Sequence, residues 1–460
     1  MDNNRNIDNI NVRNVVLDIL IQVFDENRLS HIVIREALDR YNSVSKSDKS
    51  FITRLSEGTI ERVITLDYII NKFSKIRVDK MKPVIRETVR MSVYQIMYMD
   101  SVPDSAACNE AVKLVKKRKI QGLAGFTNGI LRNIVREKNN IDFPEDKGSV
   151  KYYSINYSIP EWIVQSFTDD YGIEITKEML EGMYERQNNS ITVRVNTSKA
   201  DIEEVTELLN KQHIKAVKGR YADNTLVIQE YENVSSIEAF KRGYIQVQDI
   251  SSSLVGQISG VKSGNVCIDM CAAPGGKTIH LADRLNGTGK VFSRDISEKK
   301  VSLIKENADR CGMNNIEIQI RDATEFIKED EGVADVVIAD VPCSGMGILR
   351  KKTDIKYKIT PQTVKDLSVI SQKILKNAVK YLKTNGILIF STCTMNKREN
   401  DDIRQWLIEE MGLKPVSIID DLSDDILCIG NNRESAAEGY LQLFMTKDYD
   451  GFYISKYVKK

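Results

Sequence analysis

The chain has 460 residues, of which 42% are hydrophobic and 28% are charged, and its formal net charge is +1. This length and composition are typical of a globular protein of about three domains and argue against a disordered or fibrous chain. No apolar run approaches the roughly 18 residues of a membrane span, and the first residues lack the basic-then-apolar order of a signal peptide. The sequence therefore predicts a cytoplasmic protein with no membrane segment.

Cysteine and histidine usage limits the chemistry that is available. None of the seven cysteines forms a C-x-x-C pair or has a histidine partner at a metal-ligand spacing, so we expect no metal site. An odd number of cysteines also argues against a disulfide framework. With three histidines in the chain, catalysis is expected to fall to carboxylates, lysines or thiols. The seven cysteines are Cys108, Cys267, Cys271, Cys311, Cys343, Cys393 and Cys428, and the three histidines are His31, His213 and His280.

Residues 1–140 are predicted to form an all-helical domain, because apolar residues recur every three to four positions and glycine and proline are rare. The predicted helices span 11–24, 32–41, 48–73, 81–99, 105–117 and 122–136. This region holds 24 Lys and Arg against 17 Asp and Glu, a net charge of +7, whereas the remaining 320 residues carry −6. The imbalance favours a polyanionic partner, and solvated lysines on an ordinary helical domain are the alternative. The candidate phosphate contacts are Lys113, Lys116, Lys117, Arg118 and Lys119.

Residues 139–150 are polar and non-periodic, which indicates a linker, and residues 151–259 follow as a small α+β subdomain. Helices are predicted to begin at Pro160 and to span 174–186 and 202–212, with strands at 190–195 and 244–249.

Strand and helix patterns alternate through residues 260–460. Strands are predicted at 266–270, 290–294, 316–320, 334–339 and 386–390, and helices at 276–285, 298–310, 363–382 and 397–410. Short links between them require right-handed crossovers, so the fold class is α/β, with a doubly wound and mostly parallel sheet. Residues 440–446 and 451–457 are predicted to form an antiparallel pair at one edge.

The first strand of this domain ends in a glycine-containing turn, which is where such sheets bind ligands. A phosphate-binding P-loop would need glycine at position 271, where the chain has Cys271, and the dinucleotide pattern G-x-G-x-x-G is absent. The turn instead resembles motif I of RNA cytosine-5 methyltransferases, D-x-C-A-A-P-G-G-K-T, matched from Asp269 to Thr278. The resemblance implies a class I methyltransferase fold that binds S-adenosylmethionine. The implied cofactor-loop residues are Cys271, Ala272, Ala273, Pro274, Gly275, Gly276 and Lys277.

Three aspartates end the next three strands. Asp295, about 20 residues beyond the turn, is placed to accept the ribose hydroxyls of an adenosine cofactor. The family pattern assigns the adenine amine to Asp322, and Asp340 begins the segment Asp340–Gly345, Asp-Val-Pro-Cys-Ser-Gly, which resembles motif IV with Val341 in place of alanine. The strand before Asp340 also resembles the Walker B segment of an NTPase, but the absence of a P-loop weakens this interpretation.

Two cysteines, Cys343 and Cys393, are predicted to lie at the ends of neighbouring strands, the second in a segment that resembles motif VI. A thiolate that adds to C6 of cytosine makes C5 nucleophilic. The resemblance implies that Cys393 is the nucleophile and that Cys343 assists product release. It implies that Asp340 hydrogen-bonds the base, and Asp340 is also expected among the cofactor-binding residues, with Asp295 and Asp322. DNA cytosine methyltransferases use the Pro-Cys cysteine instead, so spacing alone leaves Cys343 open as the nucleophile. Lys277 and Arg350 are candidates to stabilise the thiolate.

The other regions extend the resemblance. Residues 1–140 resemble the NusB-like RNA-binding domain of the ribosomal small-subunit methyltransferase B family, through Glu57–Arg62 and Phe126–Arg132 among other segments. Arg194–Asn196 and Val247–Asp249 match the small RNA-binding subdomain of that family. The base-approach loop at 345–354 departs from the pattern, because Lys351-Lys352-Thr353 replaces Arg-His-Pro, and Gln442-Leu-Phe-Met445 departs from Gln-x-x-Pro.

The resemblance implies an enzyme that methylates C5 of a specific cytosine in small-subunit (16S) rRNA through a covalent cysteine intermediate. Another rRNA or a tRNA is the alternative substrate, and an NTPase or a non-catalytic RNA-binding factor is the alternative class. We expect a monomer. The sequence leaves open which cytosine is modified and whether free rRNA or an assembly intermediate is the substrate.

Overall fold

A computed structural model describes residues 11–41, 44–146, 148–185 and 190–460, and these residues form two compact units. One unit comprises residues 1–180 together with 349–358, and the other comprises 181–348 and 359–460. Among the described residues, no helix is both long enough and apolar enough to cross a membrane.

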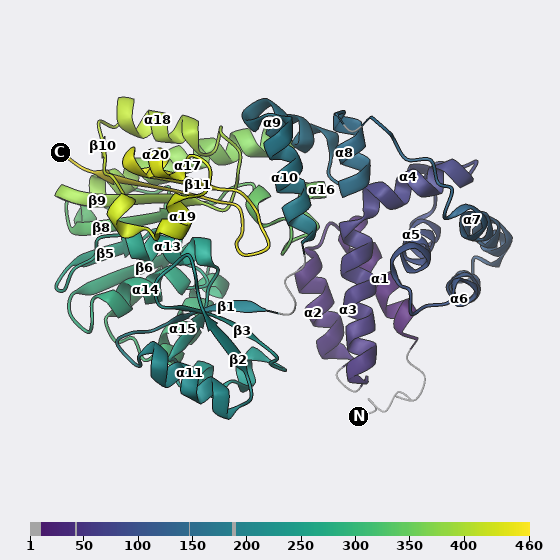
Figure 1. The fold of residues 1–460 in the computed structure, drawn as a ribbon, viewed down its shortest axis with the longest axis horizontal. Helices are drawn as coiled ribbons and strands as arrows, with labels where there is room; N and C mark the ends of the chain where they lie inside the picture. Colours follow the sequence, from purple (N-terminus) through teal and green to yellow (C-terminus); the bar gives the residue numbers. More distant parts are fainter. Residues whose placement is uncertain (1–10, 42–43, 147, 186–189) are drawn as a thin grey trace. The chain divides into compact units, whose positions relative to one another are not determined.

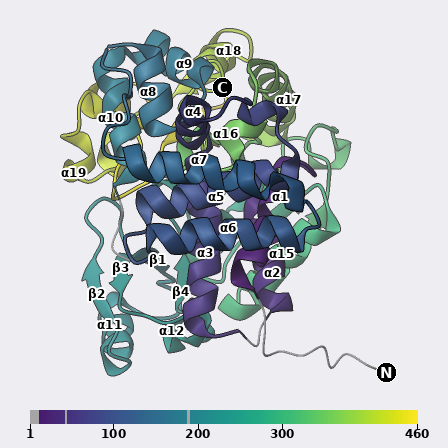
Figure 2. The same ribbon diagram turned by 90° about the vertical axis from the view of Figure 1, so that its right-hand side faces the viewer.

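The first unit is helical, as expected, and Figure 2 shows α5, α6 and α7 running alongside one another. Three of its helices begin at residues that favour a helix N-terminus. The Asn11 side chain accepts the Asn14 N–H, the Ser45 side chain accepts the Asp48 N–H, and Pro83 occupies the first turn of α5. The helices are α1 (Val12–Phe24), α2 (Ser30–Arg40), α3 (Lys46–Glu61), α4 (Val63–Phe73), α5 (Pro83–Tyr98), α6 (Asp104–Lys117), α7 (Ala124–Glu137), α8 (Val150–Tyr157), α9 (Glu161–Tyr171) and α10 (Ile173–Tyr184). Helix α10 crosses into the second unit, and Arg186, the predicted end of that helix, lies outside the described residues.

The prediction of one helix over residues 48–73 is wrong, because the chain breaks at Arg62 into α3 and α4. Arg62 donates to the carbonyl of Asn156, and the Ser158 hydroxyl accepts the N–H of Ile64 in the first turn of α4. This cap comes from residues about 94 positions away. The apolar periodicity of the sequence continues through Arg62, so this periodicity does not reveal the break.

The segment 349–358, which includes α16 (Ile355–Lys358), is built into the helical unit. Asp354 is 1% exposed and accepts both the Ser30 N–H at 3.1 Å and the Ser30 hydroxyl at 2.6 Å. The Tyr357 ring lies 6.2 Å from that of Phe24, centroid to centroid. These contacts make residues that follow motif IV part of the core of the helical unit.

Lys356, in the same segment, is expected to make the stability of the helical unit depend on pH. It is 1% exposed, and burial lowers its pKa to about 7. Between that pH and the ordinary value near 10.5, the unfolded chain holds a proton that the folded chain lacks, so stability rises with pH across this window. The effect of Lys356→Met on the stability of the unit is therefore expected to be more favourable at about pH 6 than at about pH 9, by about 3 kcal/mol, since each of the two pH units between pH 9 and the lowered pKa corresponds to about 1.4 kcal/mol.

Denaturant unfolding at both pH values measures this effect, with the exposed Lys82→Met as the control. Lys356 donates to the Glu61 carbonyl, and in the variant this carbonyl keeps the hydrogen bond that it accepts from the Tyr357 hydroxyl. An equal effect of Lys356→Met at the two pH values would contradict the prediction.

The second unit contains a four-stranded antiparallel sheet in the order β2-β3-β1-β4. Helix α11 (Ile202–Lys211) lies against it (Figure 1), and its Val205 and Leu209 share a core with Val193 and Ile228 of the sheet. The strands are β1 (Ile191–Val195), β2 (Lys215–Lys218), β3 (Thr225–Gln229) and β4 (Ile245–Val247). The two predicted strands are confirmed as β1 and β4, whereas β2 and β3 were not predicted.

The larger sheet has the order β10-β12-β9-β8-β5-β6-β7, with β11 paired to β12. Strands β7, β6, β5, β8 and β9 are parallel and β12 is antiparallel to β9, so the predicted doubly wound, mostly parallel sheet is confirmed. The strands are β5 (Val266–Asp269), β6 (Lys290–Asp295), β7 (Ile316–Ile320), β8 (Ala334–Asp340), β9 (Leu382–Thr392), β10 (Lys414–Pro415), β11 (Tyr440–Leu443) and β12 (Phe452–Val458).

Each face of this sheet packs a separate hydrophobic core. Cys267 of β5 faces a core shared with α13 and α14, whereas the next residue, Ile268, faces a core shared with α17 and α18. Successive strand side chains point to opposite faces, and both faces are covered by helices, which explains the continuous apolar strands. The helices are α13 (Ile250–Ile258), α14 (Gly276–Arg284), α15 (Glu298–Cys311), α17 (Pro361–Tyr381), α18 (Asp401–Glu409), α19 (Asp424–Leu427) and α20 (Asn432–Ala437).

Two predictions for this sheet need correction. The helix predicted from residue 397 begins at Asp401, because residues 396–400 turn back toward β9. The C-terminal strands do pair, but β12 is an interior strand between β9 and β10 rather than an edge strand. The second error concerns long-range pairing, which local periodicity does not report.

Candidate active site

The predicted cofactor loop lies at the carboxyl end of β5 and leads directly into α14. Gly275 has φ of +106°, a conformation that favours glycine, and it precedes the first helical residue, Gly276. The Ala273 N–H donates to the Asp295 carboxylate at 2.9 Å, and the Ala272 N–H donates to the Arg294 carbonyl at 2.8 Å. The loop is therefore held against the end of β6.

Three carboxylates surround this loop. Burial raises the pKa of the Cys271 thiol well above its usual range, and Asp269, Asp295 and Asp340 raise it further, which places all three near Cys271. Asp269 is fully buried; Thr278 donates to one of its oxygens, and the other has no hydrogen-bond partner among the described residues. Burial raises the pKa of Asp269 to about 6.

Asp322 follows β7, the strand beyond β6, and is not part of that cluster. Its carboxylate accepts the N–H and the hydroxyl of Thr324, at 2.8 and 2.7 Å, which lowers its pKa. One oxygen is therefore committed to a local turn. The structure places Asp322 at the same edge of the sheet as Asp295, because β6 and β7 are parallel neighbours.

Lys277 and Asp340 form an ion pair at the ends of α14 and β8. Lys277 Nζ lies 2.7 Å from one Asp340 oxygen, and the Ser391 hydroxyl donates to the other at 2.8 Å. Burial opposes protonation of Lys277, but the Asp340 carboxylate prevails and raises the lysine pKa. Cys393 contributes to the same rise, which places this thiol within electrostatic reach of the ammonium group.

The two cysteines predicted to act in catalysis lie side by side. Cys343 Sγ is 3.2 Å from Cys393 Sγ, and both side chains are partly exposed. The hydrogen bond with Cys393, together with burial, raises the pKa of Cys343 well above its usual range. The protonated form of Cys343 is therefore favoured.

Of the two cations proposed to stabilise a thiolate, Lys277 belongs to the same compact unit as the thiols. Arg350 belongs to the segment 349–358 of the helical unit.

Sequence reasoning missed four residues that hold the thiol loops in place: Glu399 and Asn400, which it assigned to a helix, and the glycines Gly347 and Gly451. The Gly347 N–H donates to the Cys393 carbonyl at 2.9 Å, and the Gly451 N–H donates to the Gly347 carbonyl at 2.9 Å. A Cβ on Gly451 would lie 2.9 Å from Gly347 Cα and 2.6 Å from the Met395 sulfur. A signal was available in the segment Asp450–Tyr453, Asp-Gly-Phe-Tyr, which also resembles the family pattern and whose glycine marks this close crossing.

Within the motifs Arg194–Asn196 and Val247–Asp249, the polar side chains of Arg194, Asn196 and Gln248 are buried and form a network. Arg194 is 1% exposed, and its guanidinium donates to Gln248 at 3.0 Å and to Asp283 at 3.2 Å. Gln248 lies against Gly276, where an added Cβ would be 3.7 Å from the amide carbon. The network therefore connects β1 of the smaller sheet to the helix that follows the cofactor loop.

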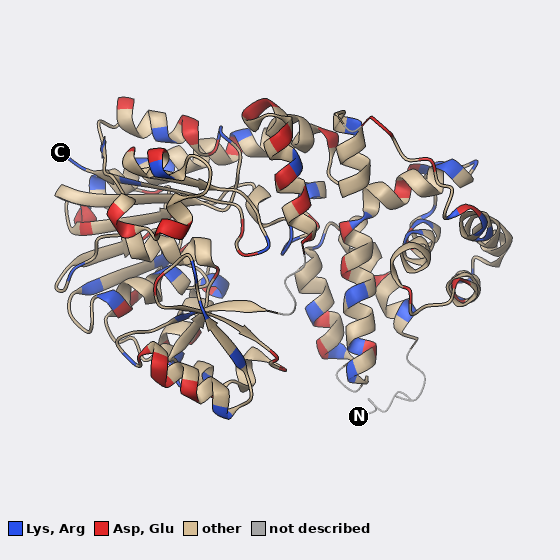
Figure 3. Cartoon of the chain, viewed as in Figure 1, with Lys and Arg blue, Asp and Glu red and all other residues tan. Residues whose placement is uncertain are grey.

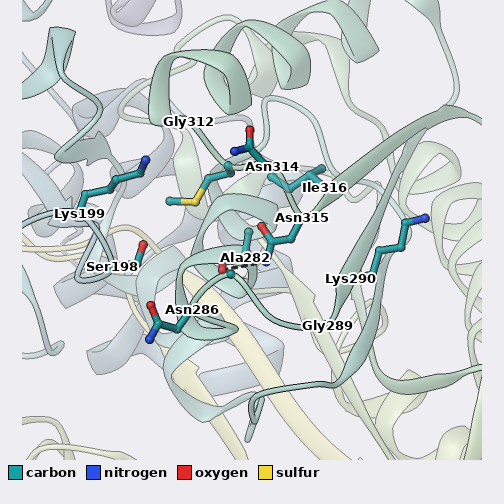
Figure 4. Close-up of a pocket in the computed structure, with 12 residues that line it drawn as sticks. Ser198, Lys199, Ala282, Asn286, Gly289, Lys290, Gly312, Asn314, Asn315 and Ile316 are labelled. Atoms are coloured by element: carbon teal, nitrogen blue, oxygen red, sulfur yellow. Dashed lines mark hydrogen bonds between the residues drawn. The ribbon is translucent and has the colours of Figure 1, made fainter.

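A pocket of about 550 Å³ opens at the other end of the larger sheet (Figure 4). It is lined by the residues where β6 and β7 begin, Lys290 and Ile316, with Lys199 on the opposite side from Lys290. Ligands of such sheets bind at the carboxyl ends of the strands. This pocket is therefore distinct from the constellation around the thiols.

The predicted basic cluster of the helical unit divides into paired and exposed members. Lys113 pairs with Glu110 at 2.8 Å, and Arg118 pairs with Asp18. Lys116, Lys117 and Lys119 are exposed. Elsewhere in the unit, basic and acidic positions are interspersed along α2 and α3 (Figure 3).

Comparisons with known proteins cover all three regions. A family model described as 16S rRNA methyltransferase RsmB/F matches residues 258–458, a NusB family model matches 10–136, and a ferredoxin-like domain of RsmF/B-like methyltransferases matches 159–235. The solved structure of PH0851 superposes with a TM-score of 0.78 over 98% of this chain and 99% of that chain, at 22% identity, which supports the fold.

Two curated relatives extend over most of the chain. The probable ribosomal RNA small subunit methyltransferase B of Bacillus subtilis is 34% identical over 403 residues, 87% of this chain and 88% of that protein. Its counterpart from Synechocystis is 30% identical over 398 residues, 85% of this chain and 87% of that protein. The chain therefore belongs to the RsmB/F family of 16S rRNA methyltransferases and carries the NusB domain at its N-terminal end.

Proposed function

We propose that this protein transfers the methyl group of S-adenosylmethionine to C5 of a cytosine in small-subunit rRNA, through a covalent bond between Cys393 and C6. The observation that carries the proposal is the pair of thiols 3.2 Å apart, with the Lys277–Asp340 ion pair beside Cys393. Packing alone does not require two cysteines at adjacent strand ends. Family membership supports the rRNA substrate.

The residues around the cofactor loop fit S-adenosylmethionine, which would supply an electrophilic methyl group when bound. Gly275 and Gly276 lack side chains that would keep a ligand from the backbone. Asp295, oriented by the Ala273 N–H, is suited to the ribose hydroxyls, and Asp322 to the adenine amine. The buried, unpartnered oxygen of Asp269 leaves an acceptor in the same loop. The loop residues proposed to hold the cofactor are Cys271, Ala272, Ala273, Pro274, Gly275, Gly276 and Lys277.

Cys393 is the proposed nucleophile. Its sulfur bonds to C6 while the C5–C6 double bond opens, which makes C5 a nucleophile. After methylation, loss of the C5 proton restores the double bond as the sulfur–C6 bond breaks. Cys343 is the weaker candidate for attack because its raised pKa disfavours the thiolate. As a protonated neighbour, it stabilises the departing Cys393 sulfur.

The ion pair has a separate role at each end. Asp340 is proposed to hydrogen-bond the N3 and N4 edge of the base as positive charge develops there. Lys277, which is coupled electrostatically to Cys393, is proposed to stabilise negative charge on that sulfur as it attacks and leaves. Phosphate contacts are assigned to the exposed lysines of the helical unit, Lys116, Lys117 and Lys119, which position RNA without reading its sequence.

The test is to identify the product. Incubation with methyl-labelled S-adenosylmethionine and small-subunit rRNA, followed by digestion to nucleosides, is expected to yield label in 5-methylcytidine. Transfer RNA and large-subunit rRNA test the alternative substrates, and ATP hydrolysis tests the NTPase alternative. Label in a nucleoside other than 5-methylcytidine would overturn the proposed chemistry, and label confined to tRNA would overturn the substrate.

A further inference from the structure

A buried carboxylate joins the two loops that carry the thiols. Glu399 is 2% exposed, and one of its oxygens accepts the Ser344 N–H at 2.7 Å. The other accepts the Ser344 hydroxyl at 2.5 Å and the Thr394 hydroxyl at 3.2 Å. Ser344 directly follows Cys343 and Thr394 directly follows Cys393, so Glu399 binds the neighbour of each thiol.

The next residue, Asn400, holds the Cys393 loop from a second direction. Its fully buried side chain accepts the Thr392 hydroxyl at 2.6 Å and donates to the Thr394 carbonyl at 3.1 Å. Thr392 and Thr394 flank Cys393. The same amide donates to Gln442 of β11 at 2.9 Å, which ties the loop to the C-terminal strands.

The donors around Glu399 suit a group that accepts at both of its oxygens. An ionised carboxylate accepts at both oxygens, whereas a glutamine amide would turn an N–H₂ group toward Ser344 or Thr394. Burial raises the pKa of Glu399, and the hydrogen bonds from Ser344 and Thr394 oppose that rise. Glu399 also helps to keep Cys343 protonated, after the contributions of Cys393 and burial.

We infer that Glu399 is a positioning residue that, together with Asn400, sets the separation and orientation of the Cys343 and Cys393 thiols. Among the described residues, the hydrogen bonds of its carboxylate go to Ser344 and Thr394, not to the cofactor loop or the Lys277–Asp340 pair. The expected effect of Glu399 on methyl transfer rests on the proposed function. Its expected effect on the geometry of the two thiols does not.

The first readout is therefore independent of RNA and of S-adenosylmethionine. Diamide accepts two electrons and two protons from a thiol pair, which forms a disulfide while the diazene becomes a hydrazine. The rate of the Cys343–Cys393 cross-link, measured by non-reducing peptide mass spectrometry, reports how the thiols are aligned. Glu399→Ala is expected to slow it roughly 10- to 100-fold, the scale for misplaced reacting groups, with Glu399→Gln intermediate. The matched control is Glu410→Gln, the same change at an exposed position after α18.

The second readout is steady-state methylation. We expect Glu399→Gln to lower kcat while leaving KM for S-adenosylmethionine unchanged, because the cofactor loop is untouched. Thermal denaturation of each variant separates misalignment from unfolding, and Glu399→Gln is the near-isosteric change. Cross-linking that depends on Glu399 in a protein that methylates no RNA would support the positioning role and refute the proposed function. Wild-type cross-linking and kcat in both Glu399 variants would overturn the inference.

Discussion

Cys393→Ala is expected to abolish methyl transfer, lowering kcat by roughly four orders of magnitude or more, as loss of a covalent nucleophile does in other enzymes. The reason is that C5 of cytosine is nucleophilic only while a sulfur is bonded to C6. Alanine cannot form that bond, and Cys343 is a poor replacement because burial raises its pKa even without the contribution of Cys393. The measurement is methyl transfer from labelled S-adenosylmethionine to small-subunit rRNA, combined with a denaturing gel for covalent protein–RNA complexes.

Cys343→Ala is the diagnostic partner of that variant. It leaves the nucleophile in place but removes the neighbour that stabilises the departing sulfur, so a covalent protein–RNA band is expected to accumulate. Cys428→Ala, at an exposed cysteine, is the control and should behave as wild type. The reverse pattern would assign the nucleophile to Cys343. Full activity in both variants would remove the covalent mechanism and most of the case for C5.

Asp283→Ala is expected to destabilise the second unit by about 3–5 kcal/mol, the usual cost of leaving one member of a buried ion pair without its partner. Asp283 is 2% exposed at its side chain and pairs with Arg194 at 3.2 Å. It also accepts the backbone N–H groups of Thr197 and Ser198, at 3.0 and 2.8 Å. Its loss therefore leaves a buried guanidinium without its counter-charge and two backbone N–H groups without their acceptor. Differential scanning calorimetry should show the unit melting roughly 10 °C lower.

The matched control is Asp425→Asn, which breaks the exposed pair with Arg220, where 68% of the arginine side chain is accessible. Exposed pairs contribute about 0–1 kcal/mol, so its melting temperature should change little. Arg194→Met combined with Asp283→Leu should recover part of the loss, because the stranded charge is then gone. A shift for Asp283→Ala no larger than that of the control would refute the role of this pair.

Much of the catalytic fold could be predicted from local pattern. The strand–helix alternation after residue 260 predicted five parallel strands, and all five are present, because a strand covered on both faces must be continuously apolar. The position of an aspartate just after such a strand predicted where Asp295 and Asp340 would lie. Cys343 and Cys393 were expected at adjacent strand ends for the same reason, and their sulfur atoms are 3.2 Å apart.

Contacts between distant residues decided the rest. The break at Arg62 depends on a cap from Ser158, and the interior place of β12 depends on pairing with β9. Neither leaves a local trace, since both sides of the break keep a helical period and strands at an edge or in the interior can share one pattern.

Glu399 shows the same difference between local pattern and tertiary contact at the candidate active site. By sequence it was one charged residue in an expected helix, with a solvated face as its ordinary location. In the fold it is a buried carboxylate between Ser344 and Thr394, 55 and 5 positions away. The sequence by itself determined the family, the succession of the five parallel strands along the chain and the residues with reactive groups, because these follow from local pattern and residue type. Only the tertiary structure decided which buried donors meet that carboxylate, because a hydrogen-bond partner is set by packing rather than by spacing along the chain.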